Sequence, residues 1–271
     1  MAHEGRVKYS ELVLKRMEKS LVTKNHMIFN TNYEGNPVSG SVKIPVMGAA
    51  TVADYDPVNG IAPTQGETTY LDVLVNKDKA VNEIIDGWDS VSVPGGLVVT
   101  RLTRAGKALA TTLDADGLSV LATEGTVLEN TTALTKTTAY EALVDAFTQQ
   151  SEADITLENR YAIVKPSIHA LLLKSSDFIK QSDLGQELVE NGVVGKVAGY
   201  NIFVSNNMPA NVEFIAGHAD CATRINAWKK DVKVVDLDGD AQYVGACAVK
   251  GRMRYGHKVS IPAGIIVKTV A

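Results

Sequence analysis

The sequence lacks long apolar runs, a cysteine framework and a strong excess of charge of one sign. No run approaches the roughly 20 apolar residues that a membrane-spanning helix needs. The N-terminus has no charged segment followed by an apolar one, so it does not resemble a signal peptide. Cys221 and Cys247 are the only cysteines, and we expect them to be buried free thiols in a reducing compartment. These absences predict a soluble chain that is neither exported nor held in a membrane.

The charge balance argues against a protein that grips nucleic acid. The formal net charge is −4 and the pI is near 5.8, whereas neutralising phosphates needs clustered Lys and Arg. Residues 1–30 are more basic than the rest of the chain. A solvated amphipathic helix is the preferred interpretation of this excess over a functional basic arm, and contact with a neighbouring molecule stays open.

Motifs that carry chemistry are missing as well. Gly106-Lys107 and Gly195-Lys196 both lack the Ser or Thr that completes a P-loop, and no dinucleotide-binding pattern of glycines is present. No nucleophile motif stands in a catalytic context. The histidines are scattered without the spacing of a zinc helix: His3, His26, His169, His218 and His257. The sequence therefore predicts a chain that is not an enzyme and that uses no cofactor or metal.

Two segments come closest to a binding site. Residues 236–240 begin like a calcium loop, but Cys247 stands at the twelfth position, where that loop needs a Glu, so we expect a turn between strands. Residues 250–258 hold four basic side chains and one aromatic, which fits a nucleic-acid patch. In a strand Arg252 and Arg254 share one face, which also fits a strand at a contact between copies. The second interpretation is favoured.

Hydrophobic periodicity divides the first half into an arm, a hairpin and a long helix. Residues 8–21 have helical spacing of apolar side chains, and residues 42–46 and 68–75 read as two strands separated by a loop of turn formers. A helix over residues 92–115 follows, capped by Ser92 and stopped at Asp116-Gly117. Its apolar stripe, which we expect to be buried, consists of Val98, Leu102, Ala105, Leu109 and Leu113.

Shorter elements alternate in the second half. A capping box at Thr138 predicts a helix over residues 138–151. Strands are expected over residues 161–164, 200–205, 212–215 and most of 231–270, and helices over residues 167–174 and 219–228. Between them, Gly192, Gly195 and Gly199 break an apolar run, and they can supply positive φ or close backbone approach.

This glycine segment, together with the upstream run Arg160-Tyr-Ala-Ile-Val-Lys-Pro-Ser-Ile168, resembles the A-domain of tailed-phage major capsid proteins of the Hong Kong 97-like fold. The order of the other elements is similar to that family over most of the chain. The resemblance implies an α+β fold with these parts: N-terminal arm 1–36, E-loop 37–80, P-domain with spine helix 81–158, A-domain 159–235, and closing strands 236–271 that return to the P-domain.

The resemblance implies a shell protein whose main partner is itself, as hexamers and pentamers, assembled in the host cytoplasm and located in the virion. It would enclose double-stranded DNA without specific binding. Only a short arm precedes the E-loop, so we expect a separately encoded scaffolding protein, besides a portal. Lys43, Lys77 and Lys79 are E-loop lysines by location alone, and no covalent crosslink is predicted.

Candidate contact residues come from the arm, the hairpin and the basic strand: Tyr9, Met17, Val42, Ile44, Asp54, Tyr55, Tyr70, Arg252 and Arg254. Two alternatives stay open. An encapsulin-like nanocompartment shell would share the fold and enclose an enzyme, and an α/β enzyme with an unrecognised site would need a deep polar pocket.

Overall fold

The computed structural model describes residues 21–23, 28–33, 40–47, 52–58, 60–61, 66, 68–92, 96–175, 196–239 and 242–270. The helix expected over residues 8–21 lies outside this part except for Leu21, and so do Tyr9, Met17, Gly192 and Gly195.

The helices are α1 (Gly87–Ser92), α2 (Leu97–Glu124), α3 (Thr138–Glu152) and α4 (Pro166–Leu173), with two 3-10 turns, η1 (Ala219–Cys221) and η2 (Pro262–Gly264). The strands are β1 (Ser41–Met47), β2 (Thr68–Leu74), β3 (Lys77–Ile85), β4 (Thr126–Val127), β5 (Arg160–Val164), β6 (Lys196–Val197), β7 (Tyr200–Val204), β8 (Val212–His218), β9 (Ala222–Asp236), β10 (Cys247–Val259) and β11 (Ile265–Thr269).

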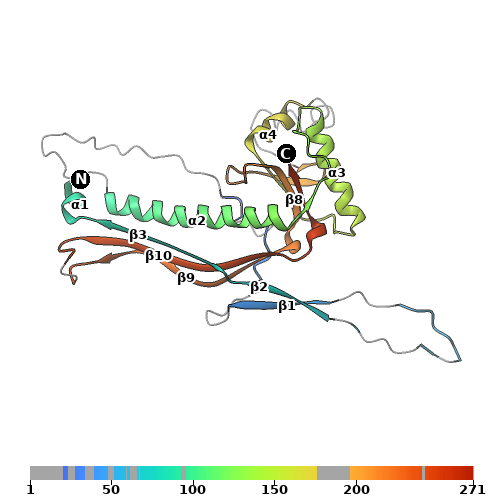
Figure 1. Cartoon of the computed structure of the whole chain (residues 1–271), viewed down its shortest axis with the longest axis horizontal. Coiled ribbons are helices and arrows are strands. Elements are labelled where there is room, and N and C mark those ends of the chain that lie inside the picture. Colours follow the sequence, from blue (N-terminus) through green and yellow to red (C-terminus); the bar gives the residue numbers. More distant parts are fainter. Residues whose placement is uncertain are drawn as a thin grey trace.

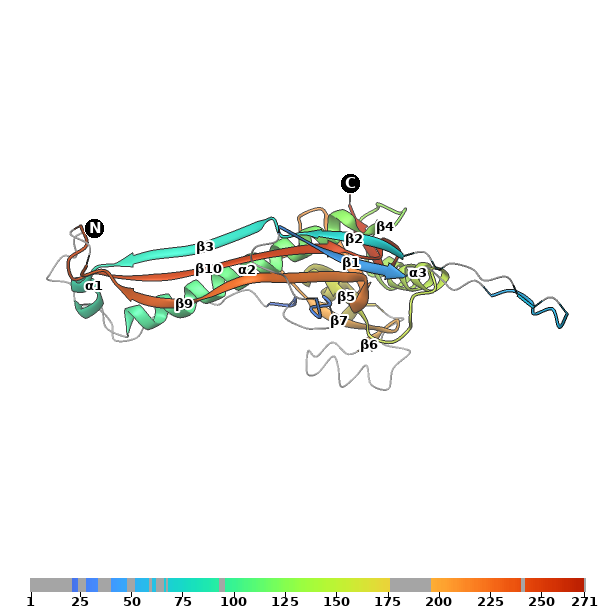
Figure 2. The same ribbon diagram turned by 90° about the horizontal axis from the view of Figure 1, so that it is seen from below.

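The molecule is elongated around the long helix α2 (Figure 1). An antiparallel sheet in the order β3-β10-β9 runs alongside α2, and a six-stranded mixed sheet in the order β4-β11-β8-β5-β7-β6 lies near its C-terminal end. The hairpin of β1 and β2 leaves the three-stranded sheet on the side away from α2, and its tip extends beyond the rest of the molecule (Figures 1 and 2). The hairpin comprises residues 40–74, and we call the rest of the molecule the body.

The six-stranded sheet is covered on both faces, as the contacts of its central strand β5 show. All five residues of β5 are buried. Ala162 and Val164 pack with α3 and α4, whereas Tyr161 and Ile163 pack with the C-terminal half of α2 and with Phe29. Because successive side chains of a strand point to opposite faces, a continuous apolar run is what a strand between two layers needs.

The long helix differs from the expectation at both ends. Ser92 ends the separate helix α1, and α2 begins after Gly96, whose φ of 67° lies in the left-handed region. Gly117 does not stop α2, which continues to Glu124. A Cβ at Gly117 would lie 3.1 Å from the Phe29 ring and 3.2 Å from His257, so the glycine serves close packing against the helix.

The helix expected over residues 219–228 is wrong, because this segment is the 3-10 turn η1 followed by the first half of β9. Its side chains alternate with a period of two: Ile225 and Ala227 pack under the hairpin, whereas Arg224 and Asn226 line a pocket on the α2 side. Pairing with β10 over almost its full length overrides the weak helical spacing.

Other expectations are confirmed. The two strands of the hairpin pair antiparallel from Ser41 with Leu74 to Met47 with Thr68. Gly199 has a φ of 82° in the turn between β6 and β7, where an added Cβ would lie 2.7 Å from the Phe147 ring. Residues 236–239 leave β9 as a turn, as expected for the segment that resembled a calcium loop.

Candidate functional site

The tip of the hairpin is the most exposed apolar feature that the structure describes. Val52 is 91% exposed, Tyr55 72% and Val58 88%. A local turn holds them, because the Asp56 carboxylate accepts a hydrogen bond from the Val58 N–H at 2.8 Å and the Asp56 carbonyl accepts one from Gly60 N–H at 2.8 Å. An ordered turn that presents apolar side chains away from the body is suited to contact with another molecule.

The root of the hairpin, in contrast, packs on its own chain. Ile44 and Val73 are buried against Ile225 of β9, and Val42 packs at the edge of this cluster. Tyr70 lies on the opposite face of the hairpin and is exposed. Gly256 of β10 permits this packing, because a Cβ there would clash with the backbone of Leu74. Of the contact candidates in the hairpin, Ile44 is therefore buried by its own chain.

The outer face of the three-stranded sheet carries basic side chains. Met253 lines a pocket beside α2 and Tyr255 donates a hydrogen bond to Asp116 of α2 at 2.8 Å. The alternation of a strand then places Arg252 and Arg254 on the face away from α2, as the sequence predicts.

Arg252 and Arg254 differ in how they are held. Arg252 donates to both oxygens of Asp78, at 2.8 and 2.5 Å, and this hydrogen bonding lowers the pKa of the Asp78 carboxyl. The Arg252 guanidinium also lies 5.8 Å from the centre of the Trp228 ring. Within the described part of the chain, no hydrogen bond or ion pair holds Arg254. Arg254 is half-buried and stands opposite Asp78 of β3, and its positive charge also helps to lower the pKa of that carboxyl.

A second exposed apolar patch lies at the opposite end of the molecule from the hairpin tip (Figure 2). Trp88 and Val91 of α1 are exposed there, next to Val244 in the connection between β9 and β10. Acidic residues, among them Asp86 and Asp89, share this end. The two ends thus both present apolar side chains that the body does not cover.

A buried polar network, which sequence spacing does not reveal, fixes the N-terminal segment to the body. The Asp114 carboxylate accepts hydrogen bonds from the backbone N–H groups of Val22 at 3.1 Å and Thr23 at 2.7 Å, and from the Asn207 side chain at 2.6 Å. Asp114 is buried in the middle of α2, a position where a carboxylate needs such partners.

Arg224 and His257 complete the network. Arg224 donates to His257 Nε2 at 3.0 Å and to the Thr23 carbonyl at 2.9 Å, and its guanidinium lies 4.6 Å from the centre of the Phe29 ring. Burial lowers the pKa of Arg224 to about 10. Burial, with the Arg224 and Lys77 charges, lowers the pKa of His257 to about 3, so His257 is a neutral acceptor.

The chemistry of a catalytic or metal site is not found among the residues that the structure describes. No group of three His, Cys, Asp or Glu side chains there could hold a metal ion. Both cysteines are free thiols, and burial raises the pKa of Cys221 to about 11, which makes it a poor nucleophile. No helix in the described ranges is long and apolar enough to cross a membrane.

A family model described as phage capsid protein matches residues 84–267, more than half of the chain. The chain belongs to the phage capsid protein family. The match spans α2, β9, the basic strand β10 and the six-stranded sheet as far as Val267 of β11, and it includes only the last two residues of β3. Membership in this structural family places the protein in the virion capsid, where copies associate into a shell, and it favours neither a nanocompartment nor an enzyme.

Solved structures share the whole fold. The chain is similar to a solved structure from Mycobacterium phage Che8, with a TM-score of 0.80 and 23% identity over 98% of both chains. It is also similar to the capsid of cyanophage P-SCSP1u, with a TM-score of 0.81 and 18% identity over 98% of this chain and 93% of that one. The mature capsid of bacteriophage PhiM1 matches with a TM-score of 0.71 and 13% identity over 99% and 92%. No curated protein sequence matches the chain. The fold is Hong Kong 97-like, mixed in helix and sheet.

Proposed function

We propose that this chain is the major capsid protein of a tailed double-stranded DNA phage or prophage, and that its copies form hexamers and pentamers of an icosahedral shell around the genome. The observation that carries the proposal is the hairpin, which packs its root on its own chain and presents an apolar, aromatic tip beyond the body. Such a tip gains stability only when another molecule covers it.

The tip of one copy lies on the outer face of the three-stranded sheet of the next copy. The tip carries Asp54 and Asp56 beside Tyr55, whereas the outer face carries Arg252 and Arg254. Opposite charges and an exposed aromatic ring make the two surfaces complementary. Each exposed ion pair contributes only about 0.2–1 kcal/mol, but closed symmetry repeats the contact around every ring of subunits.

A charge exchange tests this contact. Asp54→Lys should block assembly of purified subunits by placing a lysine against Arg254, and Arg254→Glu should block it by placing two acids together. The double variant restores opposite charges and should recover assembly, measured by sedimentation and negative-stain electron microscopy. Circular dichroism checks that each variant is folded. Single variants that assemble like the parent protein, or a double variant no better than either single one, would contradict the contact.

The opposite end of the body, with Trp88, Val91 and Val244, joins neighbouring rings of subunits. As at the hairpin tip, these apolar side chains are exposed to solvent in a single copy, and contact with a neighbouring copy would bury them. Trp88→Ser should leave isolated rings that do not close into shells. Closed shells formed by this variant at the parent yield would remove this end from the assembly contacts.

Assembly takes place in the host cytoplasm and uses a separate scaffolding protein and a portal. Identical copies that occupy both five-fold and six-fold positions need a factor that selects curvature, and a transient internal partner provides it. Expressed alone, the chain should give rings, tubes or shells of mixed size. Uniform closed shells from this chain alone would contradict the need for scaffolding. The acidic chain encloses DNA without binding a specific sequence.

A further inference from the structure

The hairpin crosses over β10 at Gly256. β3 pairs with β10 up to the pair of Lys77 with Tyr255, and the chain that precedes Lys77 then lies on the next residue of β10, Gly256. A Cβ added to Gly256 would clash with the Leu74 carbonyl oxygen and would lie 3.2 Å from the Cα of Val75. The two backbones therefore touch at this point, and only a residue without a side chain allows the contact.

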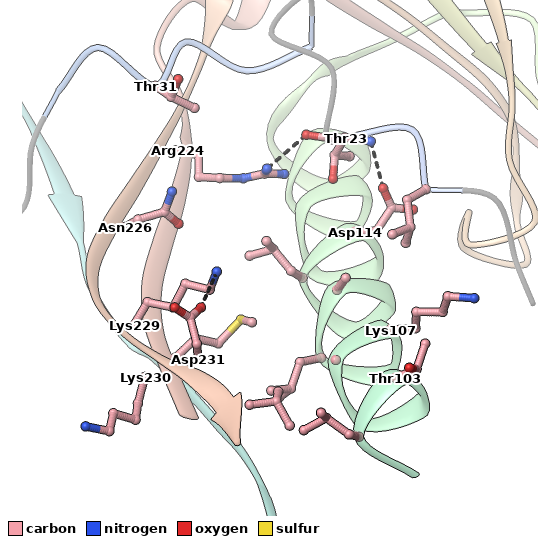
Figure 3. Close-up of a pocket in the computed structure, with 18 residues that line it drawn as sticks. Thr23, Thr31, Thr103, Lys107, Asp114, Arg224, Asn226, Lys229, Lys230 and Asp231 are labelled. Atoms are coloured by element: carbon pink, nitrogen blue, oxygen red, sulfur yellow. Dashed lines mark hydrogen bonds and ion pairs between the residues drawn. The ribbon is translucent and has the colours of Figure 1, made fainter. Parts of the chain in front are cut away.

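β9 and β10 present opposite faces to α2 and to the hairpin. A groove of about 710 Å³ separates α2 from these strands, and Figure 3 shows Arg224 and Asn226 on its strand side. Because the side chains of a strand alternate, Ile225 and Ala227 lie on the face toward the hairpin. They pack there with three buried side chains from the hairpin and its connection to β3: Ile44, Val73 and Val75. We call these five residues the apolar layer.

The hairpin acts as a lever whose root is at Gly256. Apolar contact is not directional, so the apolar layer holds the hairpin on the sheet without fixing its angle. The contact between two backbones contains no side chain that can adapt, and it fixes the angle. β1 has seven residues and is roughly 20 Å long at about 3.3 Å per residue. A tilt of about 10° at the root would move its far end by roughly 3.5 Å, more than the length of a hydrogen bond, and the tip lies farther out still (Figure 2).

We propose that Gly256 is a positioning residue for assembly, because its contact with the backbone of Leu74 sets the angle at which the hairpin leaves the body. This angle determines where the tip meets the next copy, and therefore how neighbouring copies are inclined to one another in the shell. The role in assembly rests on the contact proposed above for the hairpin tip. The position of the hairpin in an unassembled chain does not rest on it, so the two are measured separately.

Gly256→Ala tests the position of the hairpin in the unassembled full chain. Spin labels at Tyr55→Cys on the tip and at Val127→Cys on β4, two exposed sites, report the distance between hairpin and body by double electron–electron resonance. The background is Cys247→Ser, and Cys221 is buried and stays unlabelled. The added methyl group should push the root of the hairpin off β10 and shift the mean distance by about 3 Å or more.

Two controls separate this contact from packing in general. A pair of labels within the body, at Val99→Cys and Val127→Cys, should keep its distance in Gly256→Ala. Gly217→Ala adds a Cβ inside the body, 2.6 Å from the Tyr161 hydroxyl oxygen. It should lower the melting temperature without shifting the distance between hairpin and body.

Val73→Ala tests the alternative that the apolar layer sets the angle. It truncates a fully buried side chain of this layer and leaves Gly256 in place, so the distance between hairpin and body should stay that of the parent. A shift as large as the one expected for Gly256→Ala would overturn the proposal, whether or not Gly256→Ala itself folds. An unshifted distance in folded Gly256→Ala would overturn it as well.

Negative-stain electron microscopy then compares the particles that the parent, Gly256→Ala and Gly217→Ala form under the same conditions. Gly256→Ala should change the distribution of particle diameters or give open sheets and tubes. Gly217→Ala should give particles of the parent's size at a lower yield. A shifted hairpin together with particles of the parent's size would overturn the role of Gly256 in assembly and would leave the proposed shell function in place.

Discussion

The body and the hairpin use apolar side chains in opposite ways. In the body, all five residues of β5 are buried between two layers, and the core is complete within one chain. In the hairpin, β2 buries one residue of seven, Val73, and the described tip leaves Val52 and Val58 almost fully exposed. The difference supports the proposed division of two tasks, in which the body determines whether a copy folds and the hairpin determines whether folded copies associate.

The largest effect should come from a charge placed inside the body. Leu109 of α2 is 7% exposed, and Leu109→Asp should cost on the order of several kcal/mol, enough to abolish folded protein. Val99→Asp on the exposed side of the same helix should change the free energy of unfolding by less than about 0.5 kcal/mol. Urea unfolding monitored by circular dichroism measures both. Equal losses would show that α2 does not pack with Leu109 inward.

Truncating a large side chain to alanine should lower the free energy of unfolding much more in the body than in the hairpin. Phe214 of β8 is fully buried, and Phe214→Ala should lower the free energy of unfolding by about 3–5 kcal/mol. Tyr70→Ala removes an aromatic ring from the exposed face of the hairpin and should change the free energy of unfolding by about 0.5 kcal/mol or less. Urea unfolding compares the two variants. A large loss in Tyr70→Ala would mean that the hairpin is part of the folding core.

Acid should weaken the body through His257. Its folded-state pKa near 3 lies below the ordinary value of 6.5, so the unfolded chain binds the proton first. The contribution is fully present above pH 6.5 and is lost as the pH falls from 6.5 toward 3, by a few kcal/mol. His257→Gln should remove this part of the pH dependence, so that its stability at pH 4 falls less from its value at pH 7 than that of the parent. Parallel profiles would show that folding does not lower the pKa of His257.

The smallest effect on folding should accompany a reduced yield of assembly. Val58→Ser at the hairpin tip should leave the free energy of unfolding within about 0.5 kcal/mol of the parent, because the side chain is exposed. It should still reduce shell formation in sedimentation assays, since the buried apolar area is lost at every repeated contact. Normal assembly together with normal stability would place the contact elsewhere on the hairpin.

Local patterns predicted the elements whose side chains have one dominant environment. The strands of the hairpin, β5 and the helix from Thr138 were visible in the sequence because their apolar spacing matches a single periodicity. The first half of β9 was assigned to a helix, because Ile225 and Arg224 are both buried, on opposite faces, and leave no clean alternation. Long-range pairing with β10 decided its structure.

The buried network could not be derived from spacing. Asp114 bonds to Thr23, 91 residues away, and Arg224 bonds to the same residue across 201 residues. The sequence predicts that Gly117 stops the helix, whereas the structure needs a glycine there because the Phe29 ring packs against it. Phe29 is far from Gly117 in the sequence, so local spacing does not reveal this contact. Contacts of this kind depend on the folded arrangement of several elements.

Electron cryomicroscopy of closed particles assembled from this chain tests the central claim most directly. The account predicts that the hairpin tip, with Asp54 and Tyr55, lies on the outer face of β10 of a neighbouring copy, within contact of Arg252 or Arg254. A tip that folds onto its own body, or that stands in solvent in the closed shell, would contradict it.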